Sequence, residues 1–361
     1  MTTIDDFQER IRQAAGSRQP LRIRGGGTKD WYGQALEGAI LDTRGYTGIV
    51  DYEPTELVIT ARCGTPLAEI EAALAGHGQM LAFEPPHFGL EATLGGTVAA
   101  ALCGPRRAAS GATRDFVLGA SLLDGRGEVL SFGGRVMKNV AGYDVARMLA
   151  GSLGTLGLLL DISLKVLPRP MVDATLRFEM SEIDALRRLN EWGGQPLPIS
   201  ASAWCDGVLA LRLSGAHAAV DAARRLLGGD EIAQAGAFWD SVREQRHPFF
   251  AGAGAVDARA LWRLSVPSTT GALVLGGPQL IEWGGAQRWL RADGDAATAQ
   301  AVRRGAQACG GHATLFRGGA KEVGVFQPLA PALARIHARM QDAFDPARIF
   351  NPGRMYPHHR D

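Results

Sequence analysis

Glycine-rich turns recur three times in the first 160 residues, and they constrain this chain more than any other feature. They run over residues 24–29 (Arg-Gly-Gly-Gly-Thr-Lys), 93–97 (Thr-Leu-Gly-Gly-Thr) and 151–157 (Gly-Ser-Leu-Gly-Thr-Leu-Gly). Glycine lets backbone N–H groups approach an anion closely, because it has no Cβ and adopts positive φ at little cost. A single mononucleotide loop would need only one such turn. Three turns, each beside an apolar strand-like run, predict one long diphosphate ligand threaded between loops.

Two common nucleotide-binding motifs are missing from the sequence. There is no GxxxxGK[ST] segment, which disfavours a P-loop kinase or ATPase. No GxGxxG joins a first strand to a helix with an acidic residue about 20 positions later, which disfavours a Rossmann dinucleotide site. The ligand is therefore expected to lie in a different kind of diphosphate-binding domain.

Charge and cysteine spacing exclude several other classes. The formal net charge is +1, so nucleic acid is not an expected partner. Cys63, Cys103, Cys205 and Cys309 are far apart and form no CxxC pair, so we expect no metal site in this chain. The N-terminus has no signal sequence, and no apolar run reaches the ~20 residues of a spanning helix. We expect a cytoplasmic protein that does not insert into the membrane, and that meets the inner membrane only through partners.

The hydrophobic pattern predicts an α+β protein. A helix over 4–15 leads to a strand over 21–24, and Thr65 is the expected N-cap of a helix whose first residue is Pro66. A small-residue helix is expected over 96–102, directly after the Gly95-Gly96 turn. Strands over 117–123 and 129–132 flank a hairpin turn at 124–127, and a long strand over 156–166 ends at prolines 168 and 170.

The pattern changes after residue 170. Strands over 174–178 and 208–213 alternate with helices over 181–192 and 216–227, which predicts a second, smaller α+β domain. A tail helix over 329–344 places Leu333, Ile336, Met340 and Phe344 on one face. The expected domains are 1–170, 171–325 and a C-terminal segment, 326–361.

The layout of these motifs resembles the FAD-binding domain of the vanillyl-alcohol oxidase / p-cresol methylhydroxylase superfamily. Within it, the chain looks like the FAD-binding subunits of bacterial glycolate oxidases (glycolate dehydrogenases). The segments 142–144 and 154–157 match the general FAD motifs, and 246–250, 261–267 and 281–290 match this subunit family. Residues 345–353 match its C-terminal segment, which returns to the flavin domain. The resemblance implies a two-part FAD domain with a smaller α+β cap domain.

The resemblance also implies a role for each motif residue. Gly25, Gly26, Gly27 and Thr28, flanked by Arg24 and Lys29, would form the pyrophosphate turn. Thr93, Leu94, Gly95, Gly96 and Thr97 would form the second loop, against pyrophosphate and ribityl chain. Ser110, Gly111, Arg114 and Asp115 would hold the phosphate and ribityl side, and Gly154, Thr155, Gly157 and Leu158 would lie along the adenosine half.

Covalent relatives often carry a histidine directly after the first glycine turn, and Thr28 takes that place here. We therefore expect FAD bound without a covalent link. A thioether to Cys103, near the second loop, is the alternative.

Catalytic residues are harder to assign. Relatives that oxidise 2-hydroxy acids show a Glu-His-Gly segment and paired histidines, whereas residues 316–324 carry no histidine after Glu322, and His358-His359 lie at an exposed end. Arg263, Arg288 and His247 are candidates for a cationic, aromatic-lined pocket that takes a small hydroxy acid. Trp262, Trp283 and Trp289 are then core or interface anchors.

The resemblance thus implies one subunit of a glycolate-oxidising complex that passes electrons to an acceptor other than NAD. Its partners would be a homologous catalytic FAD-binding subunit and an iron–sulfur subunit. We favour electron relay or structural support over direct substrate oxidation by this chain. The alternatives are a self-sufficient D-lactate-type dehydrogenase, an NADPH-dependent enolpyruvyl reductase, and a scaffold subunit without cofactor.

Overall fold

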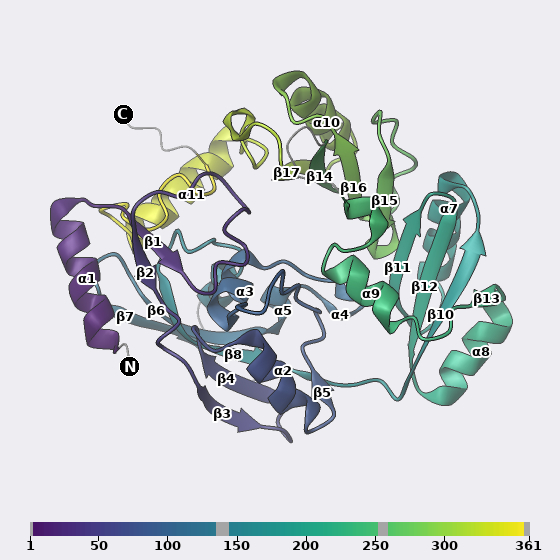
Figure 1. The fold of residues 1–361 in the computed structure, drawn as a ribbon, viewed down its shortest axis with the longest axis horizontal. Coiled ribbons are helices and arrows are strands. Elements are labelled where there is room, and N and C mark those ends of the chain that lie inside the picture. Colours follow the sequence, from purple (N-terminus) through teal and green to yellow (C-terminus); the bar gives the residue numbers. More distant parts are fainter. Residues whose placement is uncertain (1–2, 135–143, 252–258, 357–361) are drawn as a thin grey trace. The chain divides into compact units, whose positions relative to one another are not determined.

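The computed structural model describes residues 3–134, 144–251 and 259–356. The chain forms two compact units (Figure 1). The first contains residues 1–102, 112–168 and 328–361, and the second contains 103–111 and 169–327. Both units combine helices with a sheet, and the α+β class is confirmed.

The first unit contains two small strand pairs and one larger sheet. Strands β3, β4, β8, β6 and β7 form, in that order, an antiparallel sheet, and β1 pairs in parallel with β2, while β5 pairs with β9. The strands are β1 (Leu21–Arg24), β2 (Ala39–Asp42), β3 (Ile49–Glu53), β4 (Val58–Arg62), β5 (Gln79–Met80), β6 (Val117–Leu123), β7 (Val129–Gly133), β8 (Leu158–Lys165) and β9 (Leu167–Pro168). The helices are α1 (Ile4–Ser17), α2 (Leu67–Ala75), α3 (Leu94–Ala100), α5 (Thr113–Phe116), α6 (Val145–Leu149) and α11 (Pro331–Phe344).

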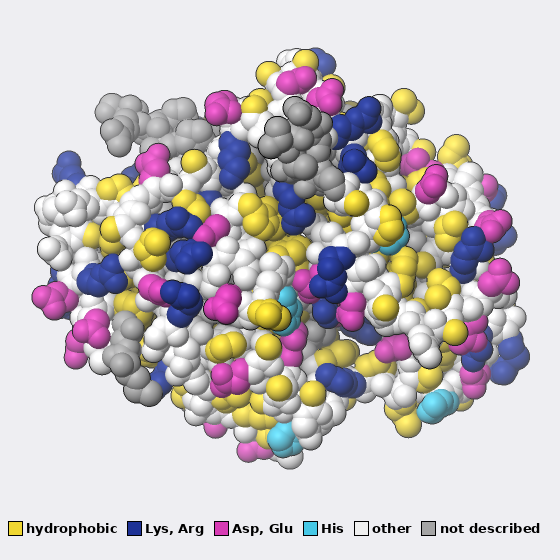
Figure 2. Space-filling model, viewed as in Figure 1, with side chains coloured by type: hydrophobic (Ala, Val, Ile, Leu, Met, Phe, Trp, Pro, Cys, Tyr) yellow, Lys and Arg dark blue, Asp and Glu magenta, His cyan; other side chains and the backbone are white. Residues whose placement is uncertain are grey.

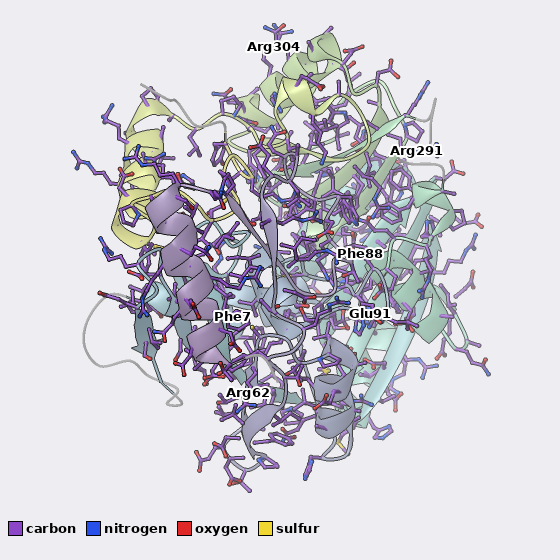
Figure 3. All side chains as sticks on the ribbon, turned by 60° about the vertical axis from the view of Figure 1, so that its left-hand side comes forward. Phe7, Arg62, Phe88, Glu91, Arg291 and Arg304 are labelled. Carbon is purple, nitrogen blue, oxygen red and sulfur yellow. The ribbon has the colours of Figure 1, made fainter. Side chains whose placement is uncertain are left out.

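Two helices pack against this sheet. α3, which is rich in small residues, contacts β4 and β8 (Figure 1), and α6 contacts β6 and β7. The predicted first helix and strand are confirmed, and α1 buries Phe7, Ile11 and Ala14 on one face. Phe7 makes an edge-on contact with Tyr46, and Figure 3 shows Phe7 on the inner side of α1.

Two predicted helix starts were wrong. Pro66, not Thr65, occupies the N-cap position of α2, because the Thr65 hydroxyl is engaged with the backbone of Gly48. α3 begins at Leu94, with Thr93 as its N-cap, so Gly95 and Gly96 lie inside its first turn. The predicted hairpin turn is confirmed, since Asp124 Oδ1 accepts the backbone N–H groups of residues 126 and 128.

The second unit is built on one antiparallel sheet of eight strands, in the order β13-β10-β12-β11-β15-β16-β14-β17. Its strands are β10 (Val172–Glu179), β11 (Ile199–Cys205), β12 (Val208–Gly215), β13 (Asp230–Glu231), β14 (Ala260–Ser265), β15 (Gln279–Glu282), β16 (Gln287–Ala292) and β17 (His312–Arg317). Its helices are α4 (Arg107–Ser110), α7 (Glu182–Gly193), α8 (His217–Leu227), α9 (Gly236–Arg243) and α10 (Ala296–Ala308), with 3₁₀ turns η1 (Pro248–Phe250), η2 (Trp283–Gly285) and η3 (Lys321–Val323).

One face of this sheet is covered by α7, α8 and α10, which pack on two apolar clusters, around Leu211 and around Trp262. α9 packs on the other face, where Trp239 contacts Ala203 and Ala210. The predicted strands and helices before residue 228 are confirmed, whereas β14 to β17 were not predicted. Trp262 is fully buried on one face and Leu261 on the other, and burial on both faces removes the alternation that reveals a strand.

The predicted tail helix is confirmed as α11, but its apolar face is not buried within the described chain. Leu333 and Ile336 are each 55% exposed. Figure 2 shows basic and acidic side chains interspersed on the visible face, as the near-zero net charge leads one to expect. None of the helices in the described ranges is long and apolar enough to cross a membrane.

Candidate functional site

The first glycine turn follows directly after β1 and lies in close contact with the loop that precedes α3. A Cβ on Gly25 would overlap the Thr93 hydroxyl, and one on Gly26 would overlap the carbonyl oxygen of Glu91. Gly27 has a φ of +71°, a conformation that residues with a side chain rarely adopt. A separate steric constraint therefore requires glycine at each of these three positions.

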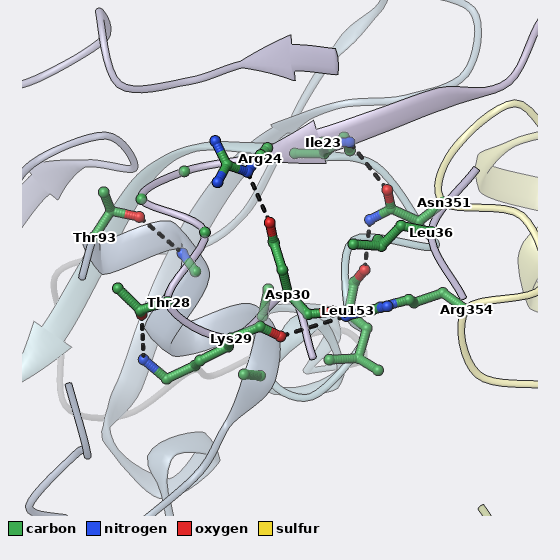
Figure 4. Close-up of a pocket in the computed structure, with 16 residues that line it drawn as sticks. Ile23, Arg24, Thr28, Lys29, Asp30, Leu36, Thr93, Leu153, Asn351 and Arg354 are labelled. Atoms are coloured by element: carbon green, nitrogen blue, oxygen red, sulfur yellow. Dashed lines mark hydrogen bonds and ion pairs between the residues drawn. The ribbon is translucent and has the colours of Figure 1, made fainter. Parts of the chain in front are cut away.

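This turn forms one wall of a cavity of about 90 Å³ (Figure 4). Among the residues that the structure describes, the backbone N–H groups of 25–28 have no hydrogen-bond acceptor. Consecutive backbone N–H groups without acceptors are suited to bind an anion. The cavity is lined by Ile23, Arg24, Gly25, Gly26, Gly27, Thr28, Lys29, Asp30, Leu36, Thr93, Gly96, Ala99, Ala100, Leu153, Asn351 and Arg354.

Positive charge dominates this lining. Arg24, Lys29 and Arg354 line the cavity, against one acid, Asp30, whose carboxylate pairs with Arg24 at 2.8 Å. Arg22 also contacts this carboxylate. Burial lowers the pKa of Arg354 to about 10, and its guanidinium donates to the Asp30 carbonyl at 2.9 Å. The excess of cations favours an anionic ligand.

The C-terminal segment completes the site from the far end of the sequence. Leu21 donates its backbone N–H to Ile349 at 2.7 Å and accepts that of Asn351 at 2.9 Å, which extends the β1 edge. The Asn351 side chain accepts the backbone N–H of Ile23 at 3.0 Å and donates to the Leu153 carbonyl at 2.7 Å. Figure 4 shows this side chain between the two segments. Asn351 thus links the first and third glycine turns.

No site role is predicted from the sequence for Asn351 or Arg354. Only the resemblance places their segment beside this domain. The available signal was the Asn-Pro-Gly-Arg run at 351–354, where a turn motif precedes an arginine. An arginine that binds three backbone carbonyls, as Arg354 does, cannot be told from a surface arginine by composition.

The second loop divides into residues that line the cavity and residues that support them. Thr93 and Gly96 line it, and the Thr93 hydroxyl accepts the Gly96 N–H at 3.4 Å. Leu94, Gly95 and Thr97 are buried. The hydroxyl oxygen of Thr97 has no hydrogen-bond partner within the described ranges.

The predicted residues of the third turn serve packing in this structure and do not line the cavity. Thr155 Oγ1 donates to a carbonyl of its own turn at 2.8 Å, and Leu158 is fully buried at the start of β8. A Cβ on Gly154 would come within 2.7 Å of Asn351 Nδ2, and one on Gly157 would collide with β6. Leu153, which was not predicted, is the cavity residue from this turn.

The remaining predicted cofactor residues lie elsewhere. Ser110 and Gly111 belong to the second unit, where the Ser110 hydroxyl donates to a carbonyl of its own segment at 3.1 Å. Arg114 and Asp115 are exposed in the first unit, and Asp115 accepts the backbone N–H of Ala112 at 2.8 Å. Residues 142 and 143 of the predicted 142–144 motif, and His358-His359, lie outside the described residues.

The catalytic candidate Arg288 is a structural residue. Its side chain is completely buried and donates to the carbonyls of Gly285, at 2.8 Å, and Thr270, at 2.7 Å. It also forms an ion pair with Glu182 at 3.5 Å. Burial lowers the pKa of Arg288. The prediction that it faces a substrate pocket is corrected, because its donors are used by the protein itself.

The other two catalytic candidates are not brought to one cavity. Arg263 lies on β14 with its guanidinium 5.4 Å from the centre of the Phe316 ring. His247 lines a large cavity of the second unit that does not include Arg263. Burial lowers the pKa of His247. Across the described part of the chain, no cluster of three or more histidine, cysteine or carboxylate side chains could hold a metal ion.

Comparison with known proteins gives three matches by sequence. Residues 1–133 match the family model described as "FAD binding domain". The chain is 51% identical to glycolate oxidase subunit GlcE of Escherichia coli strain K12 over 96% of both chains. It is 32% identical to a D-lactate dehydrogenase of Archaeoglobus fulgidus, over 50% of this chain and 41% of that protein.

A similar fold occurs in a solved structure. An alkyldihydroxyacetonephosphate synthase superposes with a TM-score of 0.66 at 14% identity, covering 96% of this chain and 75% of that one. This likeness concerns the fold alone. The FAD binding domain and the near full-length similarity to GlcE together show that the chain belongs to the GlcE family of glycolate oxidase subunits, FAD-binding flavoproteins of the p-cresol methylhydroxylase type.

Proposed function

We propose that this chain is the FAD-binding subunit of a multi-subunit glycolate oxidase, in which glycolate is oxidised to glyoxylate and electrons pass to an acceptor other than NAD. The proposal rests on the similarity to GlcE and on the row of N–H groups at the first glycine turn. Its partners would be a second, GlcD-type flavoprotein subunit and an iron–sulfur subunit.

The residues around the cavity fit a flavin diphosphate. The N–H groups of 25–28 supply donors without acceptors, and Arg24, Lys29 and Arg354 supply positive charge. Bound FAD would accept a hydride or electrons at its ring. This chain's part is to hold the diphosphate by backbone donors, which neutralise charge without adding a titrating group.

The predicted residues away from the cavity remain candidates for the rest of the cofactor. Ser110, Gly111, Arg114 and Asp115 would contact the ribityl side, and Gly154, Thr155, Gly157 and Leu158 the adenosine half. For Thr155 and Leu158 we propose a supporting role through packing, since the hydroxyl of the first is used within its turn and the second is buried.

We propose that the FAD is not covalently linked, because Thr28 follows the first turn where a linking histidine would stand. Acid precipitation of the purified chain should leave the yellow colour in the supernatant. Colour that stays with the pellet would show a covalent bond, with Cys103 as the residue to test by mass spectrometry.

We infer that the chain relays electrons or supports the complex rather than oxidising glycolate alone. Arg288 is committed to backbone carbonyls, and no histidine follows Glu322 in η3 and its flanks. The tagged chain should co-purify with a second flavoprotein and an iron–sulfur protein. Glycolate-dependent reduction of an artificial acceptor should require them. Equal turnover by the isolated chain, with glycolate or D-lactate, would favour the self-sufficient dehydrogenase instead.

Two further hypotheses for the function can be tested separately. Bleaching of the flavin by NADPH would indicate an enolpyruvyl reductase, and a colourless purified chain would indicate a scaffold subunit. The predicted cytoplasmic location, with the inner membrane reached through partners, is tested by fractionating cells that lack the partner subunits.

A further inference from the structure

Two arginines of β1 share one carboxylate beside the first glycine turn. Arg22 and Arg24 are two positions apart on the strand, so their side chains leave the same face. Both contact Oδ2 of Asp30, and the bond from Arg24 Nε measures 2.8 Å. The three side chains are 22%, 30% and 33% exposed, so the ion pairs add little to the free energy of folding. Their effect is to restrict where two long side chains lie.

A second acid on the neighbouring strand does not bond Arg24. Asp42 on β2 lies opposite Arg24 in the strand register. Its carboxylate instead accepts N–H groups of Arg44, from Nε at 3.1 Å and from Nη2 at 2.7 Å. Within the described ranges, Asp30 is therefore the carboxylate that sets the position of the Arg24 side chain.

The Arg24 guanidinium lies over Gly27. A Cβ on Gly27 would come within 2.1 Å of Arg24 Nη2 and 2.8 Å of its Nε, so this glycine also makes room for the arginine. Figure 4 shows the guanidinium beside the turn, joined to Asp30. A guanidinium has donors on three nitrogens. With Nε bonded to Asp30, the Nη N–H groups have no acceptor among the residues that the structure describes.

The other two cations that line this cavity are used differently. Lys29 donates to the His87 carbonyl at 3.2 Å, and Arg354 donates to backbone carbonyls of residues that follow the turn. The Nη donors of Arg24 thus lie next to the N–H groups of 25–28, which also lack acceptors in the described part of the chain. Both sets of donors line the same cavity and suit the same anion.

We propose that Asp30 is a positioning residue for FAD, although its own charge opposes an anionic ligand. Its carboxylate holds Arg24 by Nε, which leaves the Nη N–H groups directed to the cavity that the turn's backbone donors also line. The side chain is thereby ordered before the diphosphate binds, and preorganisation of this kind raises affinity. The inference rests on the proposed function, because it takes the anion to be the diphosphate of FAD.

Charge and positioning predict opposite effects of removing this carboxylate. Asp30→Asn deletes a negative charge beside the cavity, which by itself favours an anion. The neutral amide also attracts the guanidinium less, so Arg24 has to be ordered when the ligand binds. Water and salt screen the first effect at a partly exposed position, whereas the second acts on a direct contact. We therefore expect FAD affinity to fall about 10-fold.

The test is fluorescence titration of the full chain, freed of its FAD, with FAD as the probe. Asp42→Asn is the matched control, because it removes the same charge from a side chain of similar exposure, 40% against 33%, and keeps the bond between Arg24 and Asp30. Its affinity should stay within about 2-fold of the unaltered chain or rise. Unchanged or tighter binding by Asp30→Asn, or equal weakening in both variants, would overturn the proposal.

A double-mutant cycle shows whether Asp30 acts through Arg24. Arg24→Met should weaken FAD binding at least about 10-fold, and Asp30→Asn added to it should weaken binding no further. Additive losses would mean that Asp30 supports the turn in another way, and would overturn the positioning role.

Arg24→Lys gives a measurement that does not depend on how the Asp30 variants fold. It keeps the charge but has one nitrogen in place of three, so it cannot bond Asp30 and the ligand as the guanidinium does. It should lose most of the affinity, and binding as tight as that of the unaltered chain would contradict the proposal. Failure of the unaltered chain to bind FAD would count instead against the proposed function.

Discussion

Asn351 donates its side-chain N–H to the carbonyl of Leu153 at 2.7 Å, across 198 residues of sequence. The same side chain accepts the N–H of Ile23, so both ends of one amide are used. Asn351 as a whole is 6% exposed. It holds the start of the first glycine turn and the third turn at a set separation.

Asn351→Ala should therefore lower both stability and FAD affinity. It leaves the part-buried Ile23 N–H and Leu153 carbonyl without these partners, which should cost about 1–2 kcal/mol in the free energy of unfolding. The measurement is urea unfolding, with FAD content determined by absorbance. Asn190→Ala removes two bonds, to the carbonyls of Leu186 and Ser268, from an exposed asparagine and should change the unfolding free energy by less than about 1 kcal/mol. An Asn351→Ala chain with wild-type stability and flavin would refute the bridging role.

Gly26→Ala tests the close approach of the first turn to the loop before α3. The added Cβ would overlap the Glu91 carbonyl, and backbone cannot yield as a flexible side chain can. We expect destabilisation by about 2 kcal/mol or more and loss of most FAD. Gly16→Ala is the control, because nothing lies within 4 Å of its Cβ position and it sits in α1. Alanine there should raise stability by about 0.5–1 kcal/mol. Equal effects in the two variants would show that the turn is not compressed.

Arg288→Met should destabilise the second unit without altering the flavin. The change leaves the carbonyls of Thr270 and Gly285 and the carboxylate of Glu182 without their cationic donor. Breaking a buried charged network typically costs about 3–5 kcal/mol. Thermal unfolding measures the loss, and Arg304→Met, at an exposed position on α10, should leave the midpoint unchanged. A stable Arg288→Met chain whose complex fails only in glycolate turnover would restore Arg288 as a catalytic candidate.

Acid should weaken the fold between about pH 7 and pH 5.5, in part through His337. Burial, and next the charge of Arg348, lower the pKa of His337 on α11. The unfolded state then binds more protons than the native state just below the ordinary histidine pKa of about 6.5. Stability from the neutral ring is present above that pKa and is lost as the pH falls.

The measurement is the urea midpoint at pH 7.5 and 5.5 for the wild-type chain and for His337→Gln. The variant should show a smaller drop than the wild type. His77→Gln, at an exposed position after α2, should keep the full drop. An unchanged drop in His337→Gln would mean that other groups, such as His247, account for the effect.

The local parts of the site were predictable. The glycines at 25–27 meet steric needs of the turn itself, a positive φ or a close backbone approach. Glycine is the residue that satisfies such needs, so the sequence signals them directly. The first helix, the first strand and the hairpin at 124–127 also follow from patterns within a few residues. The cofactor class followed from the order of the turns and from the resemblance that they carry.

What the sequence could not show depends on partners far along the chain. Three arginines show this. Arg24 lines the cavity beside Asp30, and Arg354 is buried against backbone carbonyls at the same cavity. Arg288 is completely buried in the second unit. The sequence by itself determined the anion-binding turn, because steric freedom is local. Only the tertiary structure decided which charged side chains remain available to a ligand, because burial and hydrogen-bond partners are set by long-range packing.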